Sequence, residues 1–225
     1  RWAVSGGRVF PTVSRARDPH QGNRALARTL AERACPGLHP VWAFDPAFVI
    51  EEKSAQFLDR ALAAGCRAVL VNPLMRLVDL CRSPRIGELA AQLEARRIPL
   101  LLAYWRTDPE QDLIDWYHLA DFCAAHPRLP VLAWEWRTRS NRPMFDALAS
   151  APNLVVSLSS LWQAQSVAQI CTTFGAGRLV FSLGLPHLAP GSFQACVLYA
   201  DISDADRQSS AAGNLERMLS EADYG

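Results

Sequence analysis

Short apolar runs recur along this chain at nearly even intervals, and this spacing constrains the fold more than any other feature. The runs start at Arg8, Leu38, Ala68, Pro99, Pro130, Leu154 and Leu179. Successive starts are therefore 30, 30, 31, 31, 24 and 25 residues apart. Each interval fits one strand, one crossover helix and two loops. Because the runs are continuously apolar rather than alternating, they predict parallel strands covered on both faces.

The segments between the runs predict helices with recognisable ends. Ser83-Pro84 supplies an N-cap and a proline in the first turn. Residues 108–111 (DPEQ) supply a cap, a first-turn proline and a capping-box glutamine for a helix that runs to His126. Gly175 ends the helical segment that starts at Trp162, and residues 203–222 predict a closing helix.

Strands and helices that alternate in this way predict the α/β class. Seven such runs predict a (β/α)₈ TIM-type barrel with parallel strands, in which the first strand is missing or distorted because it would precede Arg1. An open doubly wound sheet is the alternative, although no glycine-rich phosphate loop follows an early strand. The sequence contains no linker or change in composition, so residues 1–225 are expected to form a single domain.

The composition excludes several classes of partner. The formal net charge of +1 gives no field that would attract nucleic acid or a membrane surface. No run reaches the ~20 apolar residues of a membrane helix, and no signal peptide follows Arg1. The six cysteines form no C-x-x-C pair, which predicts reduced, mostly buried thiols in a cytoplasmic protein.

Several segments resemble the amidohydrolase-related barrels of the metal-dependent hydrolase superfamily. The segments are FGAGRLVFSLGLPH (174–187), the closing SDADRQSSAAGNLERML (203–219), IPLLLAYW (98–105), HPRLPVLAW (126–134) and APNLVVSLSS (151–160). The resemblance covers nearly the whole chain. It implies a TIM-type barrel, hydrolase or decarboxylase chemistry, and a divalent metal at the carboxyl ends of the strands.

The resemblance also locates the family's metal ligands, and this chain lacks them at three positions. The histidine of the fifth strand corresponds to Ala103, the histidine of the sixth to Trp134, and the aspartate after the eighth to Gly184. None of these side chains offers a lone pair to a metal. An H-x-H motif after the first strand would precede Arg1. We therefore expect a degenerate site with no metal cofactor; the alternative is zinc or another divalent metal held by upstream or unorthodox ligands.

Function in this fold belongs to the carboxyl ends of the strands. The candidate ligand-binding residues there are Asn72, Tyr104, Arg106, Trp134, Arg137, Arg139 and Ser159. Aromatic walls with arginines suit a small anionic molecule, whose carboxylate or phosphate an arginine grips through paired hydrogen bonds. The alternative is that the arginines are solvated loop residues and the aromatic residues belong to the core.

Two functions remain open. The first is a binding or assembly protein built on a barrel that has lost its metal. The second is a hydrolase or decarboxylase with Glu135 or Asp45 as general base, His187 as general acid and Arg137 as a clamp on substrate charge.

Two further features of the sequence allow more than one interpretation. A nucleophilic serine at Ser157, Ser159 or Ser160 beside His187 competes with the interpretation that these serines cap the next helix. The apolar segment DLIDWYHLADF (112–122) is compatible with a homodimer formed through outer helices, and equally with burial against the barrel.

Overall fold

Each predicted run contains strand in the computed structural model. The structure describes residues 4, 6–12, 14, 18–33, 35–47, 52–104, 114–134, 141–161, 165–185 and 189–225. The strands are β1 (Gly7–Val9), β2 (Leu38–Pro40), β3 (Trp42–Ala43), β4 (Val69–Val71), β5 (Leu100–Ala103), β6 (Val131–Trp134), β7 (Leu154–Ser157) and β8 (Leu179–Val180). The strand positions predicted from the thirty-residue spacing are therefore confirmed.

The strands follow one another around the molecule in chain order. β1 pairs with β2, and β3 to β8 form a second sheet in the order β3-β4-β5-β6-β7-β8, with every pairing parallel. The amide of Val41 donates to the carbonyl of Val9 at 2.8 Å, which joins the two sheets. A doubly wound sheet reverses its strand order at a switch point. The sequential order seen here is that of a TIM-type barrel, which in the described residues has no strand between β8 and β1.

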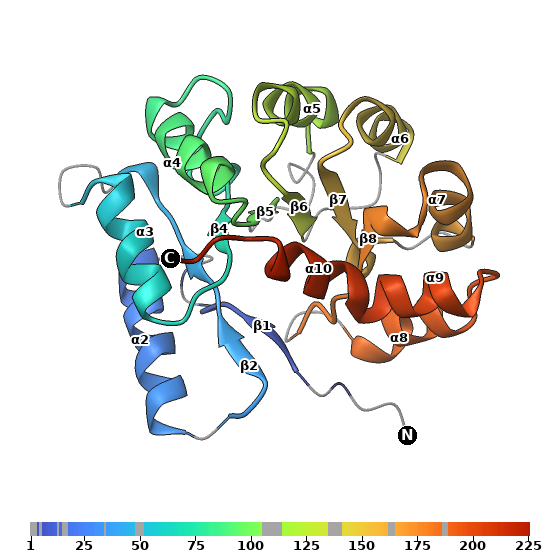
Figure 1. The fold of residues 1–225 in the computed structure, drawn as a ribbon, viewed down its shortest axis with the longest axis horizontal. Coiled ribbons are helices and arrows are strands. Elements are labelled where there is room, and N and C mark those ends of the chain that lie inside the picture. Colours follow the sequence, from blue (N-terminus) through green and yellow to red (C-terminus); the bar gives the residue numbers. More distant parts are fainter. Residues whose placement is uncertain are drawn as a thin grey trace.

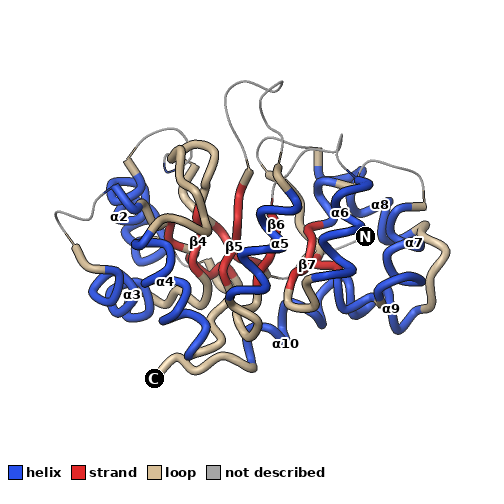
Figure 2. The backbone as a smooth tube through the Cα atoms, turned by 90° about the horizontal axis from the view of Figure 1, so that it is seen from above, coloured by secondary structure: helices blue, strands red, loops and turns tan. Residues whose placement is uncertain are grey.

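Helices surround the strands (Figures 1 and 2). They are α2 (Pro19–Glu32), α3 (Ser54–Ala63), α4 (Pro84–Ala95), α5 (Trp116–Ala125), α6 (Asn141–Ser150), α7 (Ser166–Phe174), α8 (Pro190–Leu198), α9 (Asp204–Gln208) and α10 (Asn214–Ser220). The predicted closing helix is α9 and α10 joined by a π-helical turn over Ser209–Gly213. No helix within the described ranges is both long and apolar enough to cross a bilayer.

Two separate apolar clusters show that the sheet curves into a barrel. Alternate strand residues such as Ala43, Leu70, Leu101 and Trp134 form the inner cluster, and residue Met218 of α10 packs against them. The intervening strand residues, with the inward faces of the helices, form the larger outer cluster. The interior of the barrel is thus a packed core rather than a pore.

The chain after α10 lies against the amino-terminal ends of two strands. The amide of Asp223 donates to the carbonyl of Arg96 at 2.8 Å, and the hydroxyl of Tyr224 donates to the carbonyl of Arg67 at 3.1 Å. Arg67 and Arg96 shortly precede β4 and β5 along the chain. The opposite end, where the carboxyl ends of the strands meet, is called the barrel mouth below.

The starts of two helices differ from the predicted ones. The side chain of Asp115 accepts hydrogen bonds from the amides of Tyr117 and His118, so Asp115 is the N-cap of α5 and the helix begins at Trp116. The prediction that Asp108 caps this helix was wrong. α7 begins at Ser166, later than the predicted Trp162. The cap of α4 is confirmed, since the Ser83 hydroxyl accepts from the amide of Ile86.

Two residues from the family-like segments hold the backbone together at the β7–β8 side. The Arg178 guanidinium donates to the carbonyls of Leu148, Ala151 and Leu154, and these bonds tie it to the end of α6 and the start of β7. The Asn214 amide donates to the carbonyls of Ala176 and Leu179 at 2.7 and 2.8 Å. These two residues act structurally, because they satisfy buried carbonyls that water cannot reach.

A third amide acts in the same way beside β3. The Asn23 side chain, on α2, donates to the carbonyl of Ala43 and accepts from its amide, both at 2.9 Å. Strand β1 ends at Val9, which pairs with Pro40, so it does not extend far enough to pair with Ala43. Asn23 therefore supplies the two bonds that a longer β1 would have supplied.

Candidate functional site

The side chains of the barrel mouth follow from the alternation of the strands. Ala43, Leu70 and Val155 belong to the inner cluster. Because side chains two positions apart lie on the same face of a strand, Asp45, Asn72 and Ser157 continue this inner face at the mouth. The sequence therefore brings three of its polar candidates to one end of the barrel.

The positions that correspond to metal ligands form an apolar centre. Ala103 and Trp134 are buried in the inner cluster. The ring of Phe10, which follows β1, meets the Trp134 ring edge-to-face with centroids 4.7 Å apart. Gly184 has a φ of 64°, in the left-handed region that glycine adopts without strain. Aromatic packing therefore occupies the centre of the barrel where the resemblance implied a coordinated cation.

Asp45 is paired with an arginine. Its carboxylate lies 3.2 Å from Nε of Arg76, and the two side chains are 4% and 17% exposed. Its other oxygen accepts from the amide of Ala47 at 3.0 Å, while Arg76 also donates to the carbonyl of Ser14 at 2.9 Å. Both oxygens of the Asp45 carboxylate therefore already have a partner in this structure, and this engagement opposes the predicted role of Asp45 as a general base.

Asn72 shapes the loop that carries Arg76. Its side-chain oxygen accepts from the amide of Met75 at 3.0 Å, and its carbonyl accepts from the amide of Arg76 at 3.2 Å. The residue is buried. Asn72 thus positions the arginine that pairs with Asp45.

The serines after β7 are enclosed and bonded to one another. Ser157 and Ser159 are fully buried, and their hydroxyl oxygens are 2.9 Å apart. The Ser157 hydroxyl also bonds that of Ser182 and accepts from the amide of Ser159, which caps the 3₁₀ turn Leu158–Ser160. Ser157 therefore caps this short 3₁₀ turn, whereas the N-cap of the following α-helix, α7, is Gln165. A hydroxyl held in this way is closed to a substrate in this conformation.

Tyr104 lies away from the mouth. Its ring belongs to the outer cluster between sheet and helices and is 5% exposed. Burial raises the pKa of its phenol well above the usual value. This tyrosine packs against the helices and does not line the interior of the barrel.

Five predicted site residues lie outside the described residues. They are Arg106, Glu135, Arg137, Arg139 and His187. Their assignments stay predictions.

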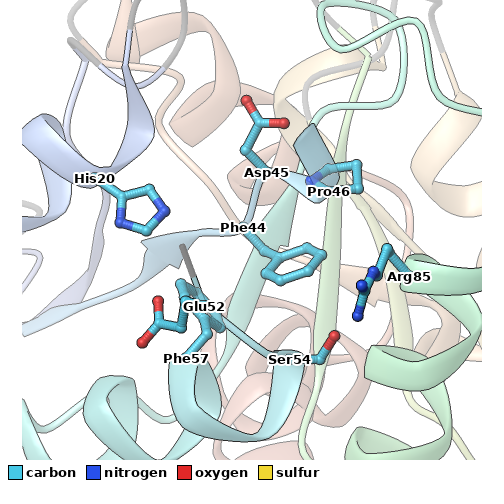
Figure 3. Close-up of a pocket in the computed structure, with 8 residues that line it drawn as sticks. All are labelled: His20, Phe44, Asp45, Pro46, Glu52, Ser54, Phe57 and Arg85. Carbon is cyan, nitrogen blue, oxygen red and sulfur yellow. The ribbon is translucent and has the colours of Figure 1, made fainter. Parts of the chain in front are cut away.

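A small hollow lies beside Asp45 on the outer side of β3 (Figure 3). Its walls include the side chains of His20, Phe44, Glu52 and Arg85. Asp45 and Ser54 lie at opposite ends of the hollow, and the Asp45 carboxylate points away from Ser54. Its volume of about 10 Å³ is close to the minimum for one water molecule. The hollow is too small for an organic ligand.

The structure also brings together three metal-ligating side chains that the sequence did not single out. Asp79, Cys81 and His118 have donor atoms within 4.8 Å of one another. The close Asp79-x-Cys81 spacing was the available signal, but the third residue comes 37 positions later.

Comparison with known proteins supports the fold. No family model and no curated protein matches the sequence. Among solved structures, a TIM-barrel protein from Bordetella bronchiseptica is 20% identical over 96% of this chain and 78% of its own, with a TM-score of 0.75. A 2,6-dihydroxybenzoate decarboxylase from Rhizobium is 16% identical over 90% of this chain and 76% of its own, with a TM-score of 0.66.

A third structure carries a metal. A dihydroxybenzoic acid decarboxylase from Polaromonas, with bound manganese and 2-nitroresorcinol, is 14% identical over 95% of this chain and 78% of its own, with a TM-score of 0.66. At these identities the likeness shows the fold. The chain is thus a TIM-type α/β barrel. Its structural neighbours include decarboxylases and amidohydrolases, the proteins to which the sequence resemblance pointed.

Proposed function

We propose that this protein binds a small acidic molecule at the barrel mouth and does not use conventional metal catalysis there. The observation that carries the proposal is the Phe10–Trp134 contact, together with Ala103 at the neighbouring strand end. Catalytic zinc sites normally use three protein ligands and one open position. The donor chemistry of Ala103, Trp134 and Gly184 does not fit such a site.

An aromatic carboxylate is the ligand class that we favour. Two of the structural neighbours are decarboxylases of 2,6-dihydroxybenzoate and of dihydroxybenzoic acid. Arginines bind carboxylates through two parallel hydrogen bonds. Arg106, Arg137 and Arg139 are the proposed partners of the carboxylate.

Calorimetric titration with 2,6-dihydroxybenzoate tests this proposal. We expect the same affinity in EDTA and in excess Mn²⁺, and no release of carbon dioxide. Arg137→Ala is expected to weaken binding by roughly tenfold or more, since a charge-assisted bond contributes about 1.5–3 kcal/mol. Arg28→Ala on the exposed side of α2 is the matched control. Decarboxylation that needs metal, or failure of this and related aromatic carboxylates to bind, would contradict the proposal.

The second candidate is an active hydrolase or decarboxylase, which the manganese-bound neighbour favours. In this alternative Glu135 or Asp45 accepts a proton, His187 donates one, and Arg137 holds the substrate. Glu135→Gln should then lower turnover by a factor of roughly 10²–10⁴ and leave ligand affinity nearly unchanged. Equal turnover in this variant would remove Glu135 from the mechanism. An H-x-H motif in the coding sequence upstream of Arg1 would favour this alternative.

We also propose a homodimer formed through outer helices. The apolar residues Trp116, Leu119 and Phe122 of α5 are 0–1% exposed, so packing against the barrel accounts for them. Tyr117 is 60% exposed on the same helix and donates to Asp146 of α6. Light scattering after gel filtration tests the dimer, and a monomer at micromolar concentration would contradict it.

A further inference from the structure

The strongest unassigned feature is the group of Asp79, Cys81 and His118, called the outer donor group. Asp79 and Cys81 lie in the loop between β4 and α4, and His118 lies in the first turns of α5. Their three donor atoms lie within 4.8 Å of one another, with Asp79 and Cys81 exposed and His118 partly exposed. Two separate elements of the barrel wall thus present one carboxylate, one thiol and one imidazole to the same point.

Hydrogen bonds already hold this geometry. Oδ1 of Asp79 accepts from the amides of Cys81 and Arg82 at 3.0 and 2.9 Å, which fixes the carboxylate relative to the cysteine backbone. Nε2 of His118 lies 3.2 Å from the same oxygen. The Cys81 thiol donates to the carbonyl of His118 at 3.7 Å. The loop and α5 are therefore linked through all three residues of the group.

We propose that Asp79, Cys81 and His118 bind a zinc-type divalent cation on the outer wall of the barrel. Zn–S and Zn–N bonds of about 2.0–2.3 Å in a tetrahedron place neighbouring donors about 3.5 Å apart. The His118–Asp79 distance already meets this value. Rotation of exposed side chains supplies the remaining approach of about 1 Å.

The charges and donor types also suit this ion. One carboxylate and one thiolate balance the two positive charges of zinc, and a thiolate with an imidazole favours zinc over magnesium or calcium. Asp121, three positions after His118 on α5, lies close enough to act electrostatically on Cys81, and its negative charge favours a bound cation.

Three protein donors leave a fourth position of the tetrahedron open. Asp79 and His118 both line an open hollow of about 450 Å³, together with Leu77 and Val78. The exposed Leu77 side chain is 81% accessible at this rim. Water, or a small ligand in the hollow, would complete the coordination. The group lies farther along the same β4–α4 loop that carries Arg76, and it includes none of the residues proposed to act at the barrel mouth. The proposed metal site therefore does not depend on the function proposed there.

Cobalt titration of the metal-free chain tests the site directly. After dialysis against EDTA, Co²⁺ should bind at one equivalent and produce a thiolate-to-cobalt charge-transfer absorption in the near ultraviolet, which Zn²⁺ then removes. Cys81→Ser should abolish this band, and His118→Ala should weaken binding by about 100-fold or more. Cys196→Ser, which changes another partly exposed thiol, is the matched control.

The outcomes separate this site from a metal at the barrel mouth. A band that persists in Cys81→Ser assigns the cobalt to other residues and overturns the proposal, as does the absence of stoichiometric binding. Zinc should also protect Cys81 from alkylation by iodoacetamide in the wild type. Mass spectrometry of the modified peptide checks this, and equal alkylation with and without zinc would count against the site.

Discussion

The barrel mouth and the outer donor group contrast in the chemistry that they offer. At the mouth, Ala103 and Trp134 are buried and apolar where the family resemblance implies metal ligands. On the outer wall, Asp79, Cys81 and His118 bring three donor atoms together on partly solvated elements. In the described residues, two of these positions at the mouth are therefore occupied by apolar packing, whereas the loop between β4 and α4 and the start of α5 bring three potential metal ligands together. A site has to be argued from its side chains, because the fold alone does not assign it.

The largest expected effect concerns the packing of the mouth. Trp134→Ala should lower the free energy of unfolding by about 3–5 kcal/mol, because it leaves a cavity beside Phe10. Urea denaturation measures this loss. Tyr199→Ala, at a position that is 86% exposed, should change stability by less than about 0.5 kcal/mol. Equal effects of the two substitutions would show that the Trp134 ring is not part of the core.

The next prediction concerns the pH dependence of stability that the buried thiols of Cys66 and Cys123 cause, and their difference from the exposed Cys81. Burial raises the pKa of Cys66 and of Cys123 to about 12. In the unfolded chain these thiols ionise near pH 8.5, so the folded state keeps protons that the unfolded state loses. The contribution of these two thiols to the free energy of unfolding should therefore be constant below about pH 8 and fall above it. The slope approaches about 1.4 kcal/mol per pH unit for each thiol.

Urea denaturation at pH 7.5, 8.5, 9.5 and 10 measures this alkaline slope. A flat profile over that range would mean that both thiols ionise equally in the two states. At pH 8, iodoacetamide should modify Cys81 while Cys66 and Cys123 stay protected in the folded protein. The two readouts together test whether the barrel wall shields its thiols.

A smaller effect is expected for the ion pair at the mouth. Asp45→Asn removes the charge that Arg76 faces at 3.2 Å and should cost about 2 kcal/mol of stability. Asp204→Asn is the control, since its carboxylate is 97% exposed beside Arg207 and should cost less than about 0.5 kcal/mol. If Asp45→Asn is neutral for folding but abolishes turnover of an added substrate, the structural role of this carboxylate is wrong and the catalytic alternative is right.

The smallest effect on the fold should come from the outer donor group. Cys81→Ser without metal is expected to change the free energy of unfolding by less than about 0.5 kcal/mol, because the side chain is exposed. Added zinc should raise the melting temperature of the wild type and leave that of the variant unchanged. Differential scanning calorimetry in zinc and in EDTA checks this. If zinc raises the melting temperature of both proteins equally, the stabilising ion does not bind at Cys81, and a metal at the barrel mouth becomes the favoured explanation.

Strands β3 to β8 could be predicted from the sequence because each of them is buried on both faces. Leu100, Leu102, Val131 and Leu154 are fully buried, so their positions leave a continuous apolar run that a single sequence displays. The start of α5 could not be predicted in the same way. Asp108 and Asp115 are both suitable caps by residue type, and only the backbone geometry selects Asp115.

The candidate site was predicted in part. The alternation along the strands placed Asp45 and Asn72 at the mouth, but their partners Arg76 and Met75 depend on the path of the following loop. Tyr104 follows β5 directly, and its side chain took the opposite face of the sheet. The outer donor group depends on how a loop and a helix pack across 37 residues of chain, which no local pattern encodes.

The amide of Asn23 has a consequence for how this kind of barrel tolerates change. The Asn23 side chain offers one donor and one acceptor, as a peptide group does. Strand β1 can therefore end early without leaving the backbone groups of Ala43 on β3 unpaired. The carboxamide donates one hydrogen bond and accepts the other, so an aspartate of the same shape at position 23 would leave the Ala43 carbonyl without a donor. Helix α2 thereby completes the backbone hydrogen bonding of β3 beyond the end of β1, a task that falls to a neighbouring strand in the rest of the barrel.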